Sequence, residues 1–380
     1  MKSTSFALAA LAVASSATIS SAGTLSALSS FGNGDGWRAA GEVVVGDTAG
    51  TDSATPGTYN YLLTGSLERG MAYNPVSGNL ILVSRSAVGN GLRVLSGTTG
   101  ADVGFLNQGT GIITGGTFFT SVTGVGSDGQ IYVSNLQANV TTGAYKVYQW
   151  TNEAAVATTY FNSTIAGFTG TPRLGDDIDV TGSGASTGIV AGASGVIGYA
   201  SLVGTTATAV TTFAPVGPTA GDFRLGITYA GSSTDVWGKQ TGNLNLRRTT
   251  TAGVFSGNSV FNTGDAAMDY AVIGGVPCLA LLNMNTGGTA DSTTIRVFYM
   301  PDPANPVLMA FGENTTGTLA TNGNGTGAVK WGAINQLNST ATVYAMSTNH
   351  GIQAFSFSVP EPASLAALGA MGSVLARRRR

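Results

Sequence analysis

The sequence is nearly devoid of the two side chains that most often carry catalysis and cross-linking. Among its 380 residues there is one cysteine, Cys278, and one histidine, His350. A single cysteine excludes a disulfide within the chain, and its apolar surroundings predict a buried thiol. A nucleophile needs a neighbouring base, and His350 is the only imidazole in the chain. We therefore expect no nucleophilic centre of the thiol or serine type.

Charge is also scarce. Lys, Arg, Asp and Glu make up 9% of the chain, whereas soluble domains average about 25%. The formal net charge is −2, and the body alone is more acidic because basic residues concentrate at the two ends. A mildly acidic body argues against nucleic acid or an anionic membrane as a partner. Glycine is abundant instead, at 56 residues, and hydroxyl and amide side chains fill the polar positions, as in secreted bacterial β proteins.

Helical periodicity is almost absent between residues 28 and 358. Short runs rich in β-branched and aromatic residues alternate with clusters of Gly, Asn, Asp, Ser and Thr, which favours an all-β sandwich, barrel or propeller. Clear runs of this kind lie at residues 80–83, 131–133, 145–148, 295–298 and 343–346.

A weak repeat organises these runs. Six similar segments open successive units, and they lie at residues 69–73, 122–125, 173–175, 224–227, 268–271 and 330–333. Units of roughly 50 residues with about four strands each predict a β-propeller of six blades, and a β-solenoid is the main alternative. Seven blades are expected instead if the N-terminal segment forms a sheet of its own.

The last unit has only three expected strands. Closing the ring protects exposed sheet edges, so we expect the N-terminal segment to supply the missing outer strand. The strand-like runs in that segment lie at residues 42–45 and 59–63.

Two sequence patterns match well-known catalytic or nucleotide-binding motifs. Residues 124–129 match G-x-G-x-x-G, and residues 184–188 match G-x-S-x-G. Both motifs require a following helix, but a strand-like run follows each of them here. We therefore interpret them as turns and expect no enzymatic activity and no cofactor.

The densest acidic cluster is formed by Asp176, Asp177 and Asp179. Strand alternation predicts that Asp177 and Asp179 lie on one side and Asp176 on the other. Carboxylates at close spacing suit Ca²⁺, but we expect a solvated or arginine-paired cluster without a metal. Paired carboxylates are also what a glycosidase needs, and Asp222 and Asp269 are further candidates.

Three arginines, Arg69, Arg173 and Arg224, recur at equivalent positions of the repeat. On inner strands they would line one mouth of the central channel, where guanidinium groups suit anionic sugars or phosphates. In the simpler interpretation each arginine pairs with a local acid such as Glu68, Asp176 or Asp222.

The N-terminus has the features of a secretory signal peptide. Lys2 precedes an apolar run at residues 6–14, and small residues lead to Ala22. We expect cleavage after Ala22, with Ala27 as the alternative.

The C-terminus combines a Pro-Glu-Pro segment, an apolar run at residues 363–376 and four terminal arginines. As a helix, this run would extend about 21 Å, less than the ~30 Å hydrocarbon core of a bilayer. It therefore suits a transient stop in the inner membrane, with the arginines on the cytoplasmic side.

In this order, the three parts resemble the PEP-CTERM sorting signal of exported bacterial proteins. The resemblance implies that Pro360, Glu361 and Pro362 are the recognition residues and that the basic end consists of Arg377, Arg378, Arg379 and Arg380. It also implies a secretion translocon and an exosortase-type enzyme as partners, and a Gram-negative cell surface with exopolysaccharide. The stretch that begins at Arg69 resembles uncharacterised propeller-like domains of other PEP-CTERM proteins, which implies no activity.

Together these observations predict a signal peptide at residues 1–22, a propeller at residues 23–358 and a sorting signal at residues 359–380. We expect an exported structural or binding protein of the cell surface or extracellular matrix that contacts exopolysaccharide or other surface proteins. A secreted carbohydrate-active enzyme with paired carboxylates is the alternative.

Overall fold

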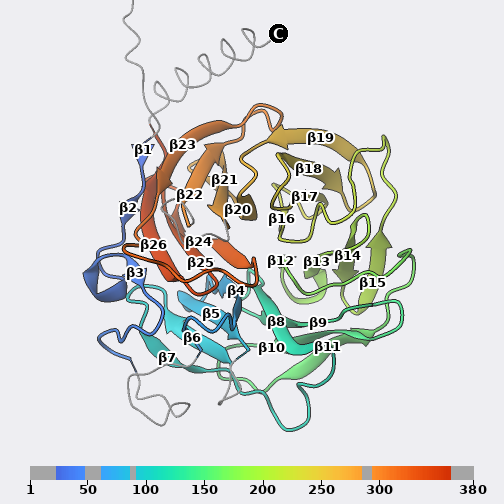
Figure 1. The fold of residues 1–380 in the computed structure, drawn as a ribbon, viewed down its shortest axis with the longest axis horizontal. Helices are drawn as coiled ribbons and strands as arrows, with labels where there is room; N and C mark the ends of the chain where they lie inside the picture. Colours follow the sequence, from blue (N-terminus) through green and yellow to red (C-terminus); the bar gives the residue numbers. More distant parts are fainter. Residues whose placement is uncertain (1–22, 48–60, 86–90, 285–292, 361–380) are drawn as a thin grey trace, which may run out of the picture.

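The computed structural model describes residues 23–47, 61–85, 91–284 and 293–360, which form an all-β propeller. Six sheets surround a central axis as six blades (Figure 1), which confirms the predicted fold and blade number. The predicted signal peptide and the predicted apolar helix at residues 363–376 lie outside the described residues. Within the described ranges, no helix has the length and apolar character needed to cross a membrane.

The first three blades follow each other along the chain. Blade 1 contains β4 (Glu68–Tyr73), β5 (Asn79–Ser84), β6 (Leu92–Ser96) and β7 (Asp102–Phe105). Blade 2 contains β8 (Phe118–Val125), β9 (Ile131–Leu136), β10 (Tyr145–Trp150) and β11 (Thr158–Ser163). Blade 3 contains β12 (Ile178–Thr181), β13 (Gly188–Gly192), β14 (Tyr199–Val203) and β15 (Thr206–Val210), with the 3₁₀ turn η2 (Gly184–Ser186) between its first two strands.

The other three blades complete the ring. Blade 4 contains β16 (Gly226–Tyr229), β17 (Asp235–Lys239), β18 (Asn245–Thr250) and β19 (Phe255–Val260). Blade 5 contains β20 (Asp265–Ile273), β21 (Val276–Asn283), β22 (Ile295–Tyr299) and β23 (Val307–Gly312), with β1 (Gly23–Thr24) added beside β23. Blade 6 contains β24 (Gly327–Asn335), β25 (Thr340–Ser347) and β26 (Gly351–Ser358), and the 3₁₀ turn η1 (Gly32–Gly34) lies in the N-terminal segment.

The middle strands are apolar because neighbouring blades cover both of their faces. Residues 80–83 of β5 and residues 279–282 of β21 are fully buried. A sheet covered on both sides favours continuous apolar runs over strict alternation. Between blades 1 and 2, for example, Ile81 belongs to one core cluster with Val133 and Trp150.

The first strand of each blade lines the channel. These inner strands, β4, β8, β12, β16, β20 and β24, lie nearest the axis in Figure 1 and contact one another in ring order. Five of the six repeat openings overlap an inner strand, and residues 173–175 directly precede β12.

Glycines in the openings allow the inner strands to approach closely. A β-carbon on Gly70 would lie 2.9 Å from the Cα atom of Val122 in the next blade. A β-carbon on Gly226 would overlap the carbonyl group of Ala266, and one on Gly124 would overlap the side chain of Val180 in β12. The glycine of the repeat is therefore a packing requirement of a narrow channel.

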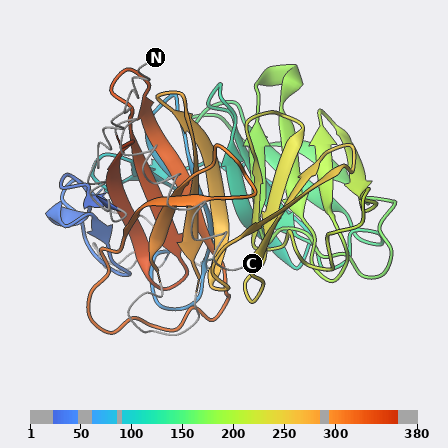
Figure 2. The same ribbon diagram turned by 90° about the horizontal axis from the view of Figure 1, so that it is seen from above.

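The ring closes through the N-terminal segment, as predicted, but the residues predicted to form the closing strand are wrong. The short strands β2 (Ser26–Ala27) and β3 (Trp37–Arg38) both pair with β26, the third strand of blade 6, and lie on its outer side. In Figure 2 this blue segment lies on the outside of the red last blade. Residues 42–45 form no strand, nor do residues 61–63, whereas residues 59 and 60 lie outside the described ranges.

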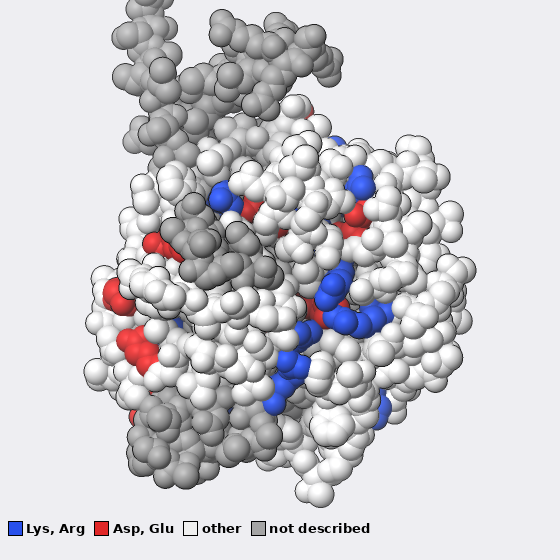
Figure 3. Space-filling view, viewed as in Figure 1, with Lys and Arg blue, Asp and Glu red and all other residues white. Residues whose placement is uncertain are grey.

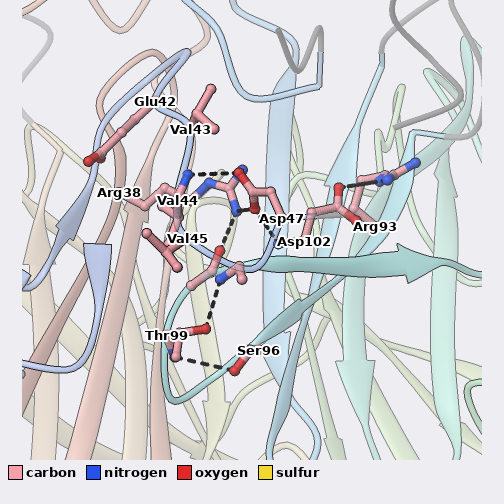
Figure 4. Close-up of polar contacts among 12 residues, drawn as sticks. Arg38, Glu42, Val43, Val44, Val45, Asp47, Arg93, Ser96, Thr99 and Asp102 are labelled. Carbon is pink, nitrogen blue, oxygen red and sulfur yellow. Dashed lines mark hydrogen bonds and ion pairs between the residues drawn. The ribbon is translucent and has the colours of Figure 1, made fainter. Parts of the chain in front are cut away.

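Side-chain hydrogen bonds explain why residues 42–45 form a loop (Figure 4). The N–H group of Val44 donates to the Asp47 carboxylate at 2.8 Å, so this donor is not free for a strand ladder. Asp47 also pairs with Arg38 at 3.0 Å and accepts the N–H of Asp102 from blade 1. The loop therefore ties the closing segment to the first blade.

Candidate functional site at the central channel

Three arginines meet at the end of the channel where the inner strands begin, which we call the arginine mouth. Arg69 lies in β4, whereas Arg173 and Arg224 lie in the segments that precede β12 and β16. All three bind the same buried carboxylate, that of Asp176. The shortest N–O distances are 3.0 Å from Arg69, 2.5 Å from Arg173 and 3.0 Å from Arg224. Figure 3 shows basic side chains gathered around acidic atoms near the centre of this face.

The shared carboxylate is held in its ionised form. Burial alone would raise the pKa of Asp176, but the hydrogen bonds of Arg173 and the charges of the three arginines outweigh it and lower the pKa. Burial lowers the pKa of Arg69 to about 10, against the attraction of Asp176. The cluster thus joins blades 1, 3 and 4 through one ionised group.

The arrangement differs from the simpler interpretation, in which each arginine has its own acid. Asp222 pairs with Arg247 at 2.7 Å, and the Glu68 carboxylate accepts backbone N–H groups. Asp176 was one of the three acids expected from the sequence, but that it serves all three arginines is a feature of the ring.

Lys330 of β24 lies beside acids of the inner strands β12 and β20, in a region we call the lysine mouth. Its Nζ atom lies 3.2 Å from Asp179 of β12 and 3.7 Å from Asp269 of β20. These three residues line a cavity of about 220 Å³. Apolar and aromatic side chains from β4, β8, β12 and β24 form the rest of its wall, and they include Tyr73, Val125, Val180, Trp331 and Ile334.

The aspartates of the lysine mouth also tie neighbouring blades together. Asp177 accepts the N–H of Ile227 at 2.8 Å, and Asp179 accepts the N–H of Tyr229 at 2.8 Å. Both acceptors belong to blade 3 and both donors to blade 4. Asp269 of blade 5 likewise accepts the N–H of a blade 6 residue, Trp331, at 2.7 Å. The carboxylates therefore satisfy backbone groups at the edges of inner strands.

Burial in the lysine mouth opposes the ionisation of two acids. Burial raises the pKa of Asp177 to about 8 and that of Asp269 to about 6. Burial would lower the pKa of Lys330, but the attraction of Asp179, Asp269 and Asp177 outweighs it and raises the pKa. Sequence reasoning did not select Lys330 as a site residue, although it stands in a repeat opening.

The acidic cluster is divided between two sets of partners, although only Asp179 lies in β12 and the other two acids precede it. Asp177 and Asp179 bind β16 residues beside Lys330, whereas Asp176 binds the arginines. Asp222 and Asp269 were the further candidates for a pair of catalytic carboxylates. Asp269 lies beside Lys330, whereas Asp222 pairs with Arg247 elsewhere. Among the described residues, no group of three His, Cys, Asp or Glu side chains is placed to hold a metal ion.

The motif-like segments lie in turns. Residues 124–129 cover the end of β8 and the hairpin that leads to β9, and residues 184–188 lead through η2 into β13. His350 lies in the hairpin between β25 and β26, where burial lowers its pKa. Cys278 is buried in β21, and burial raises the pKa of its thiol to about 12.

The fold and the C-terminal tail define a six-bladed propeller that carries a sorting signal. Residues 358–380 match the PEP-CTERM protein-sorting motif. This motif implies an exported cell-surface protein that is processed by an exosortase. A search among curated proteins found no match to the chain.

Solved structures resemble the propeller in fold. A DUF4623 family protein from Bacteroides eggerthii has a TM-score of 0.61 at 14% identity, covering 78% of this chain and 72% of its own. A protein of unknown function from Bacteroides thetaiotaomicron has a TM-score of 0.49 at 10% identity, covering 77% and 70%. Virginiamycin B lyase from Staphylococcus aureus has a TM-score of 0.42 at 13% identity, covering 79% and 88%. At such identities the likeness concerns the fold alone.

Proposed function

We propose that this chain is an exported cell-surface or matrix propeller with a structural or binding role, processed at both ends. The observation that carries the proposal is the position of the sorting motif. The motif match begins at Ser358, the last residue of β26, so the tail starts where the propeller ends. The N–H of Val359 still donates to Ser339 at 2.9 Å, which supports processing beyond this residue.

The N-terminal strands support cleavage of the signal peptide after Ala22. Residues 23–27 contribute β1 and β2, and the intervening Leu25 is buried in the core shared by blades 5 and 6. Cleavage after Ala27 would remove both strands and this side chain. A cut after Ala22 leaves the closing segment complete.

The expected partners follow from the same tail. The secretion translocon would export the chain, residues 363–376 would stop briefly in the inner membrane, and an exosortase would recognise Pro360, Glu361 and Pro362. Arg377, Arg378, Arg379 and Arg380 would stay cytoplasmic until the cut. The released propeller would then contact exopolysaccharide or other surface proteins.

Intact mass and cell fractionation of the protein from its native host test this proposal. We expect a species outside the inner membrane that begins at Gly23 and has lost the residues that follow the Pro-Glu-Pro segment. Replacement of Glu361 by Ala should retain the uncut precursor in the membrane. An unprocessed chain ending in Arg380 in the inner membrane would refute the sorting proposal.

A carbohydrate-active enzyme is the second candidate, and the lysine mouth favours it. Asp179 and Asp269 both line one cavity, and the raised pKa of Asp269 suits a general acid. We would measure release of reducing ends from acidic and neutral polysaccharides. Activity lost in Asp269→Asn but kept in Asp302→Asn, an exposed site, would support this candidate, and no release from any substrate would remove it.

A further inference from the structure

The arginine mouth holds more hydrogen-bond donors than its carboxylate accepts. Asp176 receives one hydrogen bond from Arg69, three from Arg173 and one from Arg224. A carboxylate offers about four lone-pair positions, so its accepting capacity is filled. A guanidinium group carries five N–H donors, yet Arg224 commits only its Nε atom to Asp176.

The cluster also carries more positive than negative charge. Three guanidinium groups face one carboxylate, which leaves an excess of two positive charges in the cluster. Arg85 also acts on this cluster, since its charge lowers the pKa of Arg69, and Glu68 in turn attracts Arg85. A concentrated charge of one sign at a channel mouth attracts ligands of the opposite sign.

The surplus donors face solvent, while the acid lies beneath them. The side chain of Asp176 is fully buried, whereas those of Arg173 and Arg224 are 34% and 27% exposed. Arg69 is almost completely buried, and its Nε atom has no hydrogen-bond partner. The mouth thus has a fixed buried cation, two reachable cations and an unmet buried donor.

We propose that the arginine mouth binds an oxyanion group, a carboxylate, phosphate or sulfate, on a ligand that enters from the solvent side. Arg173 and Arg224 supply the exposed donors, and Arg69 supplies positive charge below them. A planar guanidinium fork matches the two oxygens of such a group, and a buried base makes that match strong. This inference adds a ligand class to the proposed function, and it rests on that function for the location of the ligand, the cell surface or matrix.

Two sources provide this chemistry: an acidic glycan and free inorganic anion. Calorimetric titration of the purified full chain at low salt separates them, with trigalacturonate, inorganic phosphate and neutral maltotriose as probes. We expect saturable binding of the anionic probes and none of maltotriose. Tighter binding of trigalacturonate identifies an acidic glycan, and equal or tighter binding of phosphate identifies the free anion.

Variants locate the site. Arg224→Gln should weaken binding at least tenfold. The affinity of Arg224→Lys should lie between those of the parent and Arg224→Gln, because lysine keeps the charge but lacks the planar pair of N–H donors. Arg248→Gln is the matched control, since it removes the same charge from β18 of the same blade and should leave binding unchanged. Arg173→Gln provides a second test if Arg224→Gln melts early.

Binding of neither anion, or equal losses in Arg224→Gln and Arg248→Gln, overturns the inference. The fractionation experiment fails or succeeds independently of this titration. Binding without export would therefore refute the proposed function alone, and export without binding would refute only the oxyanion site.

Discussion

Asp176 and Asp177 are neighbours in the chain, yet they behave in opposite ways. Asp176 faces the arginine mouth, and its pKa is lowered; Asp177 faces the lysine mouth, and its pKa is raised to about 8. Burial pushes both values upward. The difference arises from the partners, because three cations surround one acid at the first mouth and one lysine serves three acids at the second.

This comparison shows how a chain with few charges can build two distinct surfaces at one channel. Asp176 and Asp177 lie in the segment that precedes β12 and bind different partners, and the ring supplies partners from other blades. The arginine mouth keeps surplus donors, whereas the lysine mouth keeps surplus carboxylates. Each carboxylate also has a structural task, so the strongest tests of the comparison measure stability.

Removing the acid of the arginine mouth should have the largest effect. Asp176→Asn leaves three arginines without a counter-charge, and loss of one partner of a buried pair typically costs about 3–5 kcal/mol. We expect a loss of this size in urea unfolding at pH 7. Asp302→Asn, at a nearly fully exposed carboxylate, is the control and should change the free energy of unfolding little. A loss below about 1 kcal/mol in Asp176→Asn would break the comparison.

Removing the cation of the lysine mouth should cost less, and its effect should depend on pH. Lys330→Met at pH 8 leaves the acids of the lysine mouth without their cation, and we expect a loss of about 2–4 kcal/mol. At pH 5 the loss should shrink, because the pKa of Asp269 is about 6 and its carboxyl becomes protonated. Urea unfolding at both pH values measures this, with Lys146→Met as the control. An equal loss at both pH values would count against the raised pKa of Asp269 beside Lys330.

Asp177→Asn should stabilise the protein at high pH, unlike the two preceding substitutions. Because the folded-state pKa is raised from 3.8 to about 8, the stability linked to Asp177 is complete below pH ~4 and is lost as the pH rises through 8. Asparagine stays neutral and keeps an acceptor for the N–H of Ile227. We expect a gain of about 2 kcal/mol at pH 9 and almost none at pH 4, from unfolding curves across this range. A variant less stable than the parent at pH 9 would contradict the raised pKa.

The smallest effect is expected for Arg173→Gln. Two arginines still hold Asp176 in this variant, and the side chain of Arg173 is 34% exposed. Ion pairs that reach solvent contribute about 1 kcal/mol or less. Thermal unfolding should therefore change little, which leaves this variant suitable for ligand titration. A loss as large as that of Asp176→Asn would mean that Arg173 is chiefly a structural residue.

Much of the ring was predictable from the sequence. The repeat openings gave the blade number, and five of the six contain a glycine. Alternation in residues 176–179 predicted the division of the acids. The equivalent positions of Arg69, Arg173 and Arg224 led to the hypothesis that, on inner strands, they would line one mouth. They share one acid, but only Arg69 lies on an inner strand.

Three features were beyond such reasoning. Local pairing rules could not identify Asp176 as the acid shared by all three arginines, since Arg69 and Arg224 are distant from it in sequence and only Arg173 is close. Lys330 was missed because only ring closure brings blade 6 next to the acids of blades 3 and 5. The closing strands β2 and β3 are two residues long each, too short to leave a periodic pattern.

The most direct test of the account is a crystal structure of the purified protein soaked in selenate, whose selenium gives an anomalous signal. We predict a peak within hydrogen-bonding reach of Arg173 and Arg224 and none beside Lys330. An empty arginine mouth, or equal peaks at the two mouths, would contradict the claim that they differ in surplus charge.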